Sequence, residues 1–216
     1  MSKKLETKPQ VIVILENAAL ETVKTAKGHQ LLNCDDHKGI HKKHNKDPSA
    51  SRPDILHQEL MALLDSPLNK AGYLKVYIRS AKNVLIEVSS QMRIPRTYKR
   101  FAGLMVQLLH TLKIRSSDGK TTLLKVIKNP IDAHLPANIK KYGCSCTGNL
   151  VDPWEFVSEL PREPVVFVLG AMAHGHVSKE MCPYVDEMIS VSEYPLSGAQ
   201  AVARLLNGFE RHYGVL

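Results

Sequence analysis

The sequence predicts an α/β fold, in which buried strands form a sheet flanked by helices. One observation is a set of continuous apolar, β-branched runs, typical of strands buried on both faces: residues 11–15, 123–127 and 165–169. The other is a set of longer segments with apolar residues every three or four positions, as in amphipathic helices: residues 53–66, 96–113 and 196–209. Because strands and helices alternate along the chain, the α/β class follows.

The first quarter of the chain is predicted to open with a central strand at residues 11–15. Residues 17–27 carry a few apolar positions among polar ones and end at Gly28, a pattern that suits a short helix with a glycine cap. Leu31 and Leu32 fit a return to the sheet. The polar stretch 35–51 then predicts an exposed loop inside the domain.

The middle of the chain is predicted to alternate helices with short strands. Pro53 opens a helix that we expect to end near Ser66 and Pro67. Residues 73–78 and 84–88 are β-rich runs separated by a short turn, as in a hairpin. The helix expected at 96–113 has its apolar residues on one face: Phe101, Leu104, Met105, Leu108, Leu109 and Leu112.

The C-terminal half is predicted to hold two further buried strands and a last helix. The strands are expected at 123–127 and 165–169, and the segment 128–164 between them is rich in Pro, Gly and polar residues and predicts irregular structure. Residues 187–191 fit a short strand. The helix at 196–209 is built on Ala199, Val202, Leu205 and Leu206.

The length of 216 residues fits one domain, so we expect a single domain over residues 1–216 with a flexible tail at 1–10. The longest apolar run, residues 165–173, has nine residues against the roughly 20 that a membrane helix needs. No apolar stretch follows Met1–Glu6, so we expect no secretory leader. The expectation is a protein that stays inside the cell, makes no membrane contact, and keeps its four cysteines reduced.

The charge balance points to a polyanionic partner. Lys and Arg number 29 against 21 Asp and Glu, which gives a net charge of +8. A basic surface attracts polyanions by an electrostatic term that does not depend on sequence, and nucleic acid is the leading partner. The alternative is that the charge only favours solubility.

Two arginine motifs are candidates for RNA contact. In the predicted helix, Arg96 and Arg100 are four residues apart and share a face that points away from the apolar stripe, and Tyr98 adds a stacking surface. A guanidinium group matches phosphate oxygens, so this face is a plausible RNA cradle, with a merely solvated face as the alternative. Asp54 lies two residues after Arg52 at a helix start, where it can cap the helix or orient the arginine.

The histidines and cysteines do not predict a metal site. His37, His41 and His44 lie near Cys34 and Asp35, but their spacing fits no standard zinc pattern. Cys144 and Cys146 lack the two-residue spacer of redox and zinc motifs, which favours packing or backbone donation. We therefore expect no metal.

The run 165–175 predicts a ligand site, because a buried strand passes directly into a turn that contains Gly170 and Gly175. Proteins of the α/β class place small ligands at the carboxyl ends of their strands. No Gly-Lys-Ser/Thr motif follows, which disfavours a nucleoside triphosphate. A glycine-rich turn without a ligand is the alternative.

Five blocks in this order resemble the eukaryotic ribosome-biogenesis pseudouridine-N1 methyltransferases of the SPOUT, or trefoil-knot, class: Arg52–Gln58, Asp65–Gly72, Arg93–Thr97, Lys128–Pro130 and Tyr194–Ser197. The likeness runs from about Val11 to the C-terminus. It implies a SPOUT-type parallel sheet flanked by helices, with a C-terminal trefoil knot, and a homodimer. The apolar stripe of the last helix, with Leu196, Ala199, Val202 and Leu206, is a candidate for the dimer contact, and burial of that stripe within the same chain is the alternative. It also implies methylation of a pseudouridine at ring nitrogen 1 in small-subunit ribosomal RNA, a role in the pre-ribosome, and a nucleolar location.

The resemblance implies the site residues as well. S-adenosyl-L-methionine is expected to bind at three loops, formed by Cys144, Gly170, Gly175, Val191, Ser192, Glu193, Tyr194, Pro195 and Leu196. RNA is expected to bind Arg52, Arg93, Arg96 and Arg100, with Asp54 orienting Arg52. The sequence departs from the family pattern at Cys144, His176 and Glu193, where Thr, Lys and Asn are usual. An RNA-binding assembly factor with little turnover and a ribose 2′-O methyltransferase on the same fold are the alternatives, and no general base is assigned.

Overall fold

The structure is a computed structural model, and it describes residues 10–215. The tail expected at residues 1–10 lies outside this range except for Gln10. An eight-stranded sheet runs through the molecule in the order β10-β8-β9-β1-β4-β5-β7-β6, and a separate two-stranded sheet pairs β2 with β3. The strands are β1 (Val11–Ala18), β2 (Thr22–Thr25), β3 (Gly28–Leu31), β4 (Leu74–Ser80), β5 (Leu85–Val88), β6 (Lys113–Arg115), β7 (Thr122–Ile127), β8 (Lys140–Leu150), β9 (Val165–Gly170) and β10 (Glu187–Ser190).

The helices lie between and beside these strands in the chain. The α-helices are α1 (Lys38–Lys43), α2 (Pro53–Asp65), α3 (Pro67–Lys70), α4 (Tyr98–Thr111), α5 (Pro153–Glu159) and α6 (Gly198–Tyr213), and the 3₁₀ helices are η1 (Pro48–Ala50) and η2 (Ile131–His134). Within the part of the chain that the structure describes, no helix is long and apolar enough to span a membrane. The predicted α/β class is confirmed.

The sheet is parallel on one side and antiparallel on the other. β1 pairs in parallel with both β4 and β9, and β8 pairs in parallel with both β9 and β10. The pairs β4–β5, β5–β7 and β6–β7 are antiparallel. The sheet is therefore mixed, and the five strands from β10 to β4 form its parallel part.

Both faces of β1 are buried, which explains its unbroken β-branched run. Val11, Val13 and Leu15 face the larger core, which is completed by residues of α2, α4, α5 and α6. Ile12 and Ile14 face a second core, covered by η2 and by the segment that follows β9. Side chains that alternate along a strand point to opposite faces, so a strand at the centre of two cores must be apolar throughout.

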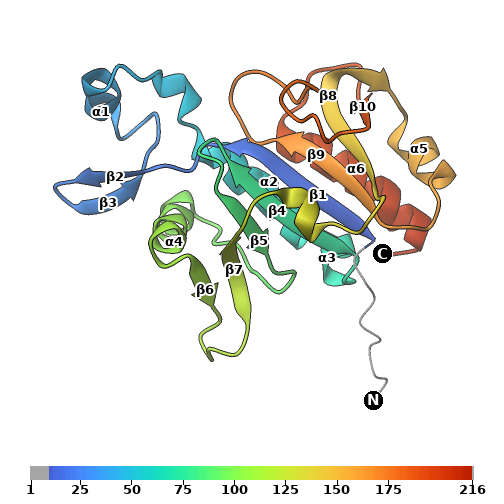
Figure 1. Cartoon of the computed structure of the whole chain (residues 1–216), viewed down its shortest axis with the longest axis horizontal. Helices are drawn as coiled ribbons and strands as arrows, with labels where there is room; N and C mark the ends of the chain where they lie inside the picture. Colours follow the sequence, from blue (N-terminus) through green and yellow to red (C-terminus); the bar gives the residue numbers. More distant parts are fainter. Residues whose placement is uncertain (1–9, 216) are drawn as a thin grey trace.

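The helix expected at residues 17–27 is absent, and this prediction is wrong. The chain forms the β2–β3 hairpin there, and Figure 1 shows it standing off from the large sheet beside α4. Gly28 has φ +94°, a conformation that glycine adopts without strain and that a hairpin turn requires as much as a helix end does. The sequence therefore correctly indicates a special backbone conformation at Gly28, but this conformation belongs to a hairpin turn and not to a helix end.

Two other segments are more ordered than the sequence predicts. The loop expected at 35–51 contains α1 and η1, and with β2 and β3 it forms an arm over residues 22–50. The segment 128–164 contains β8 and α5, so irregular structure there is wrong as well. β8 approaches its neighbour so closely that a Cβ atom on Gly148 would lie 2.5 Å from the Ile189 backbone. The small residues of β8 therefore allow close packing, and they do not show the run of apolar residues that is typical of a buried strand.

Candidate functional site

A cavity of about 480 Å³ lies at the carboxyl ends of β9 and β10, where they meet β8 and the start of α6. Eight of the nine residues expected to bind the cofactor line it: Cys144, Gly170, Gly175, Val191, Ser192, Tyr194, Pro195 and Leu196. The carboxyl ends of parallel strands are where α/β proteins place small ligands. Three segments far apart in the chain thus meet around one cavity.

Glu193 is the expected cofactor residue that does not line this cavity. It is exposed, in the segment between β10 and α6. Neighbouring backbone groups are engaged, since the Ser190 hydroxyl donates to the Ser192 carbonyl and Arg204 Nε donates to the Val191 carbonyl. The exposed Glu193 side chain therefore makes no contribution to the cavity wall.

The turn after β9 forms one wall of the cavity. Gly175 has φ +81°, which favours glycine, and Gly170 is half-buried at the strand end. A Cβ atom on Gly170 would lie 2.8 Å from Met172 Cε, the movable end of a flexible side chain. A small side chain is therefore tolerable at Gly170, whereas a large one would extend into the cavity.

A buried polar cluster anchors the segment 171–186 to the sheet. Glu16, at the end of β1, accepts hydrogen bonds from Arg79 Nε at 2.7 Å and from the Tyr184 hydroxyl. Burial, followed by the charge of Glu16, raises the pKa of Tyr184 far above its usual value, so this hydroxyl stays protonated and donates. These hydrogen bonds anchor the segment that begins at the cavity wall to strand β1.

Cys144 lines the cavity as a neutral thiol. Burial raises the pKa of this thiol to about 12, so a thiolate is disfavoured at neutral pH. Within the described residues, no cluster of three His, Cys, Asp or Glu side chains is arranged to hold a metal ion. His37 and His41 bond instead to Gln30, Ser51 and backbone groups, which gives them a structural role in the arm.

Arg52 places a positive charge in the wall of the cavity. Its side chain lines the cavity, and its Nε and Nη2 atoms donate to Asp54 Oδ1 and Oδ2 at 2.8 and 2.7 Å. The hydrogen bonds from Arg52 lower the pKa of Asp54, so the carboxylate stays charged and holds the guanidinium group in one orientation.

Arg96 does not lie on a helix, which corrects the expectation that it shares a helical face with Arg100. α4 begins at Tyr98, and Thr97 before it is extended. Two contacts draw the preceding segment toward α2: His57 Nε2 bonds to the Pro95 carbonyl at 2.7 Å, and Arg96 pairs with Asp65. The side chain of Arg96 is nevertheless 75% exposed, and Arg93 and Arg100 are exposed as well.

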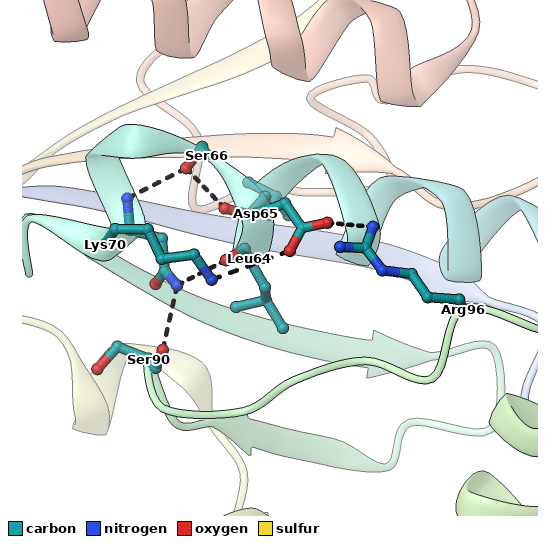
Figure 2. A network of polar contacts seen from close by, with 8 residues as sticks. Leu64, Asp65, Ser66, Lys70, Ser90 and Arg96 are labelled. Carbon is teal, nitrogen blue, oxygen red and sulfur yellow. Dashed lines mark hydrogen bonds and ion pairs between the residues drawn. The ribbon is translucent and has the colours of Figure 1, made fainter. Parts of the chain in front are cut away.

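Figure 2 shows how Asp65 joins Arg96 to the end of α2. One carboxylate oxygen of Asp65 contacts Arg96, and the other lies 3.9 Å from Lys70 Nζ. Next to it, the Ser66 hydroxyl accepts from the Asn69 amide and caps α3, while the Asn69 side chain donates to the Leu64 and Ser90 carbonyls. The loop that carries Arg93 and Arg96 is thus tied to α3 near Ser90, through Asn69, and to α2 at Arg96.

Several residues of the cavity were not predicted from the sequence. Ile55 and Gln58 reach it from α2, and Ser197, Gly198 and Ala199 reach it from the start of α6. Ser197 carries a visible signal, because a serine before a helix caps it, and here its hydroxyl accepts from the Gln200 amide. The α2 residues carry no such signal, since only the packing of α2 on α6 brings them to the cavity.

Taken together, the fold and the site define an α/β protein with a small-molecule cavity at its parallel strand ends, an arginine, Arg52, in the wall of that cavity, and further exposed arginines on the segment that leads into α4. The chain belongs to the EMG1/NEP1 methyltransferase family, whose model matches residues 13–210.

Curated relatives and a solved structure agree with this membership. The chain is 54% identical over 208 residues to the human ribosomal RNA small subunit methyltransferase NEP1, covering 96% of this chain and 83% of the relative. It is 48% identical over 219 residues to the protein of the same name from Candida glabrata, covering 100% and 93%. The structure of Archaeoglobus fulgidus Nep1 bound to S-adenosylhomocysteine superimposes with a TM-score of 0.71 at 22% identity, over 95% of this chain and 99% of that one.

Proposed function

We propose that this protein transfers a methyl group from S-adenosyl-L-methionine to ring nitrogen 1 of a pseudouridine in small-subunit ribosomal RNA. The observation that carries the proposal is Arg52, which lines the cavity and is held in one orientation by its hydrogen bonds to Asp54. A cofactor in the cavity and an RNA phosphate at Arg52 would then be neighbours. The names of the relatives and the family membership support the same activity.

The residues of the cavity suit the proposed cofactor. Its volume of about 480 Å³ lies within the range of small-ligand pockets, and apolar side chains such as Leu169 and Val191 line it together with exposed backbone at Gly170. The half-exposed glycine permits close approach of a ligand to the backbone. We propose that eight of the expected residues hold the cofactor: Cys144, Gly170, Gly175, Val191, Ser192, Tyr194, Pro195 and Leu196. Glu193 does not line the cavity and is left out of this set.

The chemistry depends on the acceptor base. In pseudouridine, ring nitrogen 1 carries a hydrogen because the sugar is bonded to carbon, whereas in uridine that nitrogen carries the sugar. S-adenosylmethionine supplies a sulfonium methyl group when it is bound. The contribution of this chain is to position the acceptor nitrogen, with Arg52, Arg93, Arg96 and Arg100 holding the RNA backbone while the cavity wall fixes the methyl donor.

The sheet order supports the proposed trefoil knot. β9 lies between β1 and β8, yet the next strand in the chain, β10, pairs with the far edge of β8. All three strands are parallel, so the chain from Gly170 to Glu187 must cross over β8. We propose that this crossing forms the loop through which the chain then passes on its way to α6.

We further propose a homodimer. Four exposed apolar side chains between the end of β8 and the start of α6 would be covered by a second copy: Leu150, Trp154, Tyr194 and Leu196. Trp154 is stacked by Arg211 at 3.9 Å in a groove between α5 and α6. Val202 and Leu206, which were expected to contribute, are buried in this chain's own core, so the contact would use the outer face of α6.

The proposed substrate places the protein in the pre-ribosome and, in a eukaryotic cell, in the nucleolus. The test of the activity uses labelled S-adenosylmethionine and matched RNA hairpins that carry uridine or pseudouridine at one position. We expect label on the pseudouridine hairpin alone. Equal label on both hairpins would favour ribose 2′-O methylation, and binding without label on either would favour an assembly factor.

A further inference from the structure

A second and larger cavity, of about 1050 Å³, lies between the arm and α4. It shares no lining residue with the cavity at the strand ends. Its walls come from β2, β3 and α1 on one side and from α4 on the other, the two parts that Figure 1 shows side by side. Nothing in the proposed methyl transfer uses this space.

The walls of the arm cavity combine apolar patches with polar side chains. Ile40 contributes from α1, and Ala102 and Val106 contribute from α4. Two exposed glycines, Gly39 and Gly103, line opposite walls, and a Cβ atom on either would enter open space with nothing within 4 Å. The space between the walls therefore suits a flat apolar group such as an aromatic ring.

The rim of the arm cavity is positively charged. Lys27, Lys43 and Lys99 are exposed lining residues, and none of them forms an ion pair with another described residue. The acidic residue of the lining, Asp36, accepts a hydrogen bond from Asn33 at 3.1 Å. The rim thus favours a ligand with negative charge.

Tyr98 lines this cavity, and its buried hydroxyl makes no hydrogen bond of good geometry. The Asn33 side chain is the hydrogen-bonding group that interacts with it. Asn33, which lies close to it, is engaged with Asp36 and with backbone groups. Burial, followed by the charge of Asp54, raises the pKa of Tyr98 above its usual value, so the hydroxyl keeps its proton and can donate.

The position of the cavity relates it to RNA. Two of its lining residues, Tyr98 and Lys99, directly precede Arg100 in the chain. The arm ends at Ser51, the residue before Arg52, and the Ser51 carbonyl accepts a hydrogen bond from the Cys34 amide. We infer that the arm cavity binds one unstacked base of the substrate RNA, a neighbour of the methylated nucleotide, with its phosphates on the lysine rim. This inference rests on the proposed function and adds a second point of base recognition to it, in the way single-stranded RNA is commonly read.

The test combines a filled cavity with RNA that lacks one base. Gly103→Phe places a ring in the open space, and Gly103→Ala is the matched control, because its methyl group improves helix propensity without filling the cavity. Both variants and the parent are titrated with the pseudouridine hairpin and with versions carrying a single abasic site at each other loop position. S-adenosylhomocysteine affinity serves as the folding control.

We expect one abasic position to weaken binding to the parent and to Gly103→Ala by about tenfold or more, the value of one well-stacked base. Gly103→Phe should bind the intact hairpin more weakly by a similar factor and should no longer distinguish that abasic hairpin. Tyr98→Phe should change which base is preferred at the same position.

The inference would be overturned, with methylation of the pseudouridine hairpin intact, by either of two results. One is that the abasic site lowers the affinity of Gly103→Phe and of the parent equally, and the other is that no abasic site besides the methylated nucleotide lowers the affinity. Absence of methylation by the parent would instead overturn the proposed function, on which the inference depends.

Discussion

Glu59 lies on α2 with a fully enclosed side chain, and neither of its carboxylate oxygens has a hydrogen-bond partner among the described residues. Burial raises the pKa of Glu59 to about 8, so the folded protein holds this carboxyl protonated at neutral pH. Its neighbour across the helix interface is Gly198, where a Cβ atom would lie 1.8 Å from Glu59 Oε1. The glycine at the start of α6 thus leaves room for the acid.

Glu59 is expected to make stability depend on pH. Between the unfolded pKa of 4.5 and the folded value of about 8, the unfolded chain releases a proton that the folded chain keeps, so stability falls as the pH rises through this window. Glu59→Gln removes this term, and its unfolding free energy should exceed that of the parent by a margin that grows by about 3 kcal/mol between pH 5 and pH 7.5. Urea unfolding at the two pH values measures the margin. A margin independent of pH would contradict the buried, protonated acid.

Gly170 is the residue at which cofactor binding is most directly tested. Gly170→Trp should abolish S-adenosylhomocysteine binding, a loss of roughly a hundredfold or more by calorimetry, because the ring would enter the cavity. Gly170→Ala is the control, since Met172 Cε can move away from the added methyl group, and it should bind within a few-fold of the parent. Unchanged affinity in a folded Gly170→Trp variant would remove this cavity as the cofactor site.

Among the elements, those with an apolar periodicity were predictable and those that depend on tertiary context were not. The strands at Val11–Ala18 and Val165–Gly170 and the helix at Pro53–Asp65 lie where the pattern placed them, because each buries its apolar positions in one of the two cores. β8 was missed, because Gly143 and Gly148 are required where neighbouring atoms leave no room for a side chain. These glycines interrupt the alternation of apolar and polar residues by which a strand is recognised in a sequence. The arm was misread, because one glycine serves a helix end and a hairpin equally well.

The candidate site was partly predictable at the same scale. The glycine turn after β9 carries its own signal, and the loop 191–196 was placed by resemblance. These two segments line one cavity together with Cys144 because of the order of the strands in the sheet. The spacing of apolar residues along the sequence does not reveal that order. The departure of Arg96 from α4 depends on Asp65 and His57, which lie some thirty or more residues away in sequence.

The segment that leads into α4 should contribute to RNA affinity through charge. Arg96→Ala and Arg100→Ala should each weaken RNA binding and make the logarithmic salt dependence shallower by roughly 0.7–0.9, the value of one lost phosphate contact. Arg96→Lys should keep the salt slope but lose affinity, because a lysine cannot make a bidentate contact. Lys120→Ala, in the exposed turn before β7, is the charge-matched control. Salt slopes equal to those of the parent would leave the arginines without an RNA role.

At the scale of the whole molecule, the exposed apolar groups at Leu150, Trp154, Tyr194 and Leu196 predict self-association. Light scattering at micromolar concentration should give twice the 24.1 kDa of one chain. Trp154→Asp should shift the mass toward that of a single chain, because it removes the ring that Arg211 stacks on and adds a charge to the groove. A parent protein with the mass of one chain would contradict the dimer.

The whole molecule also carries a net charge of +8, which attracts any RNA, so binding alone does not identify the substrate. The measurement that most directly tests the proposed activity is the identity of the methylated nucleoside. The pseudouridine hairpin is incubated with the protein and S-adenosylmethionine, digested to nucleosides and analysed by mass spectrometry with fragmentation. We predict one added methyl group on the base of pseudouridine, at ring nitrogen 1. A methyl group on the ribose, or on any other nucleoside of the hairpin, would contradict the account.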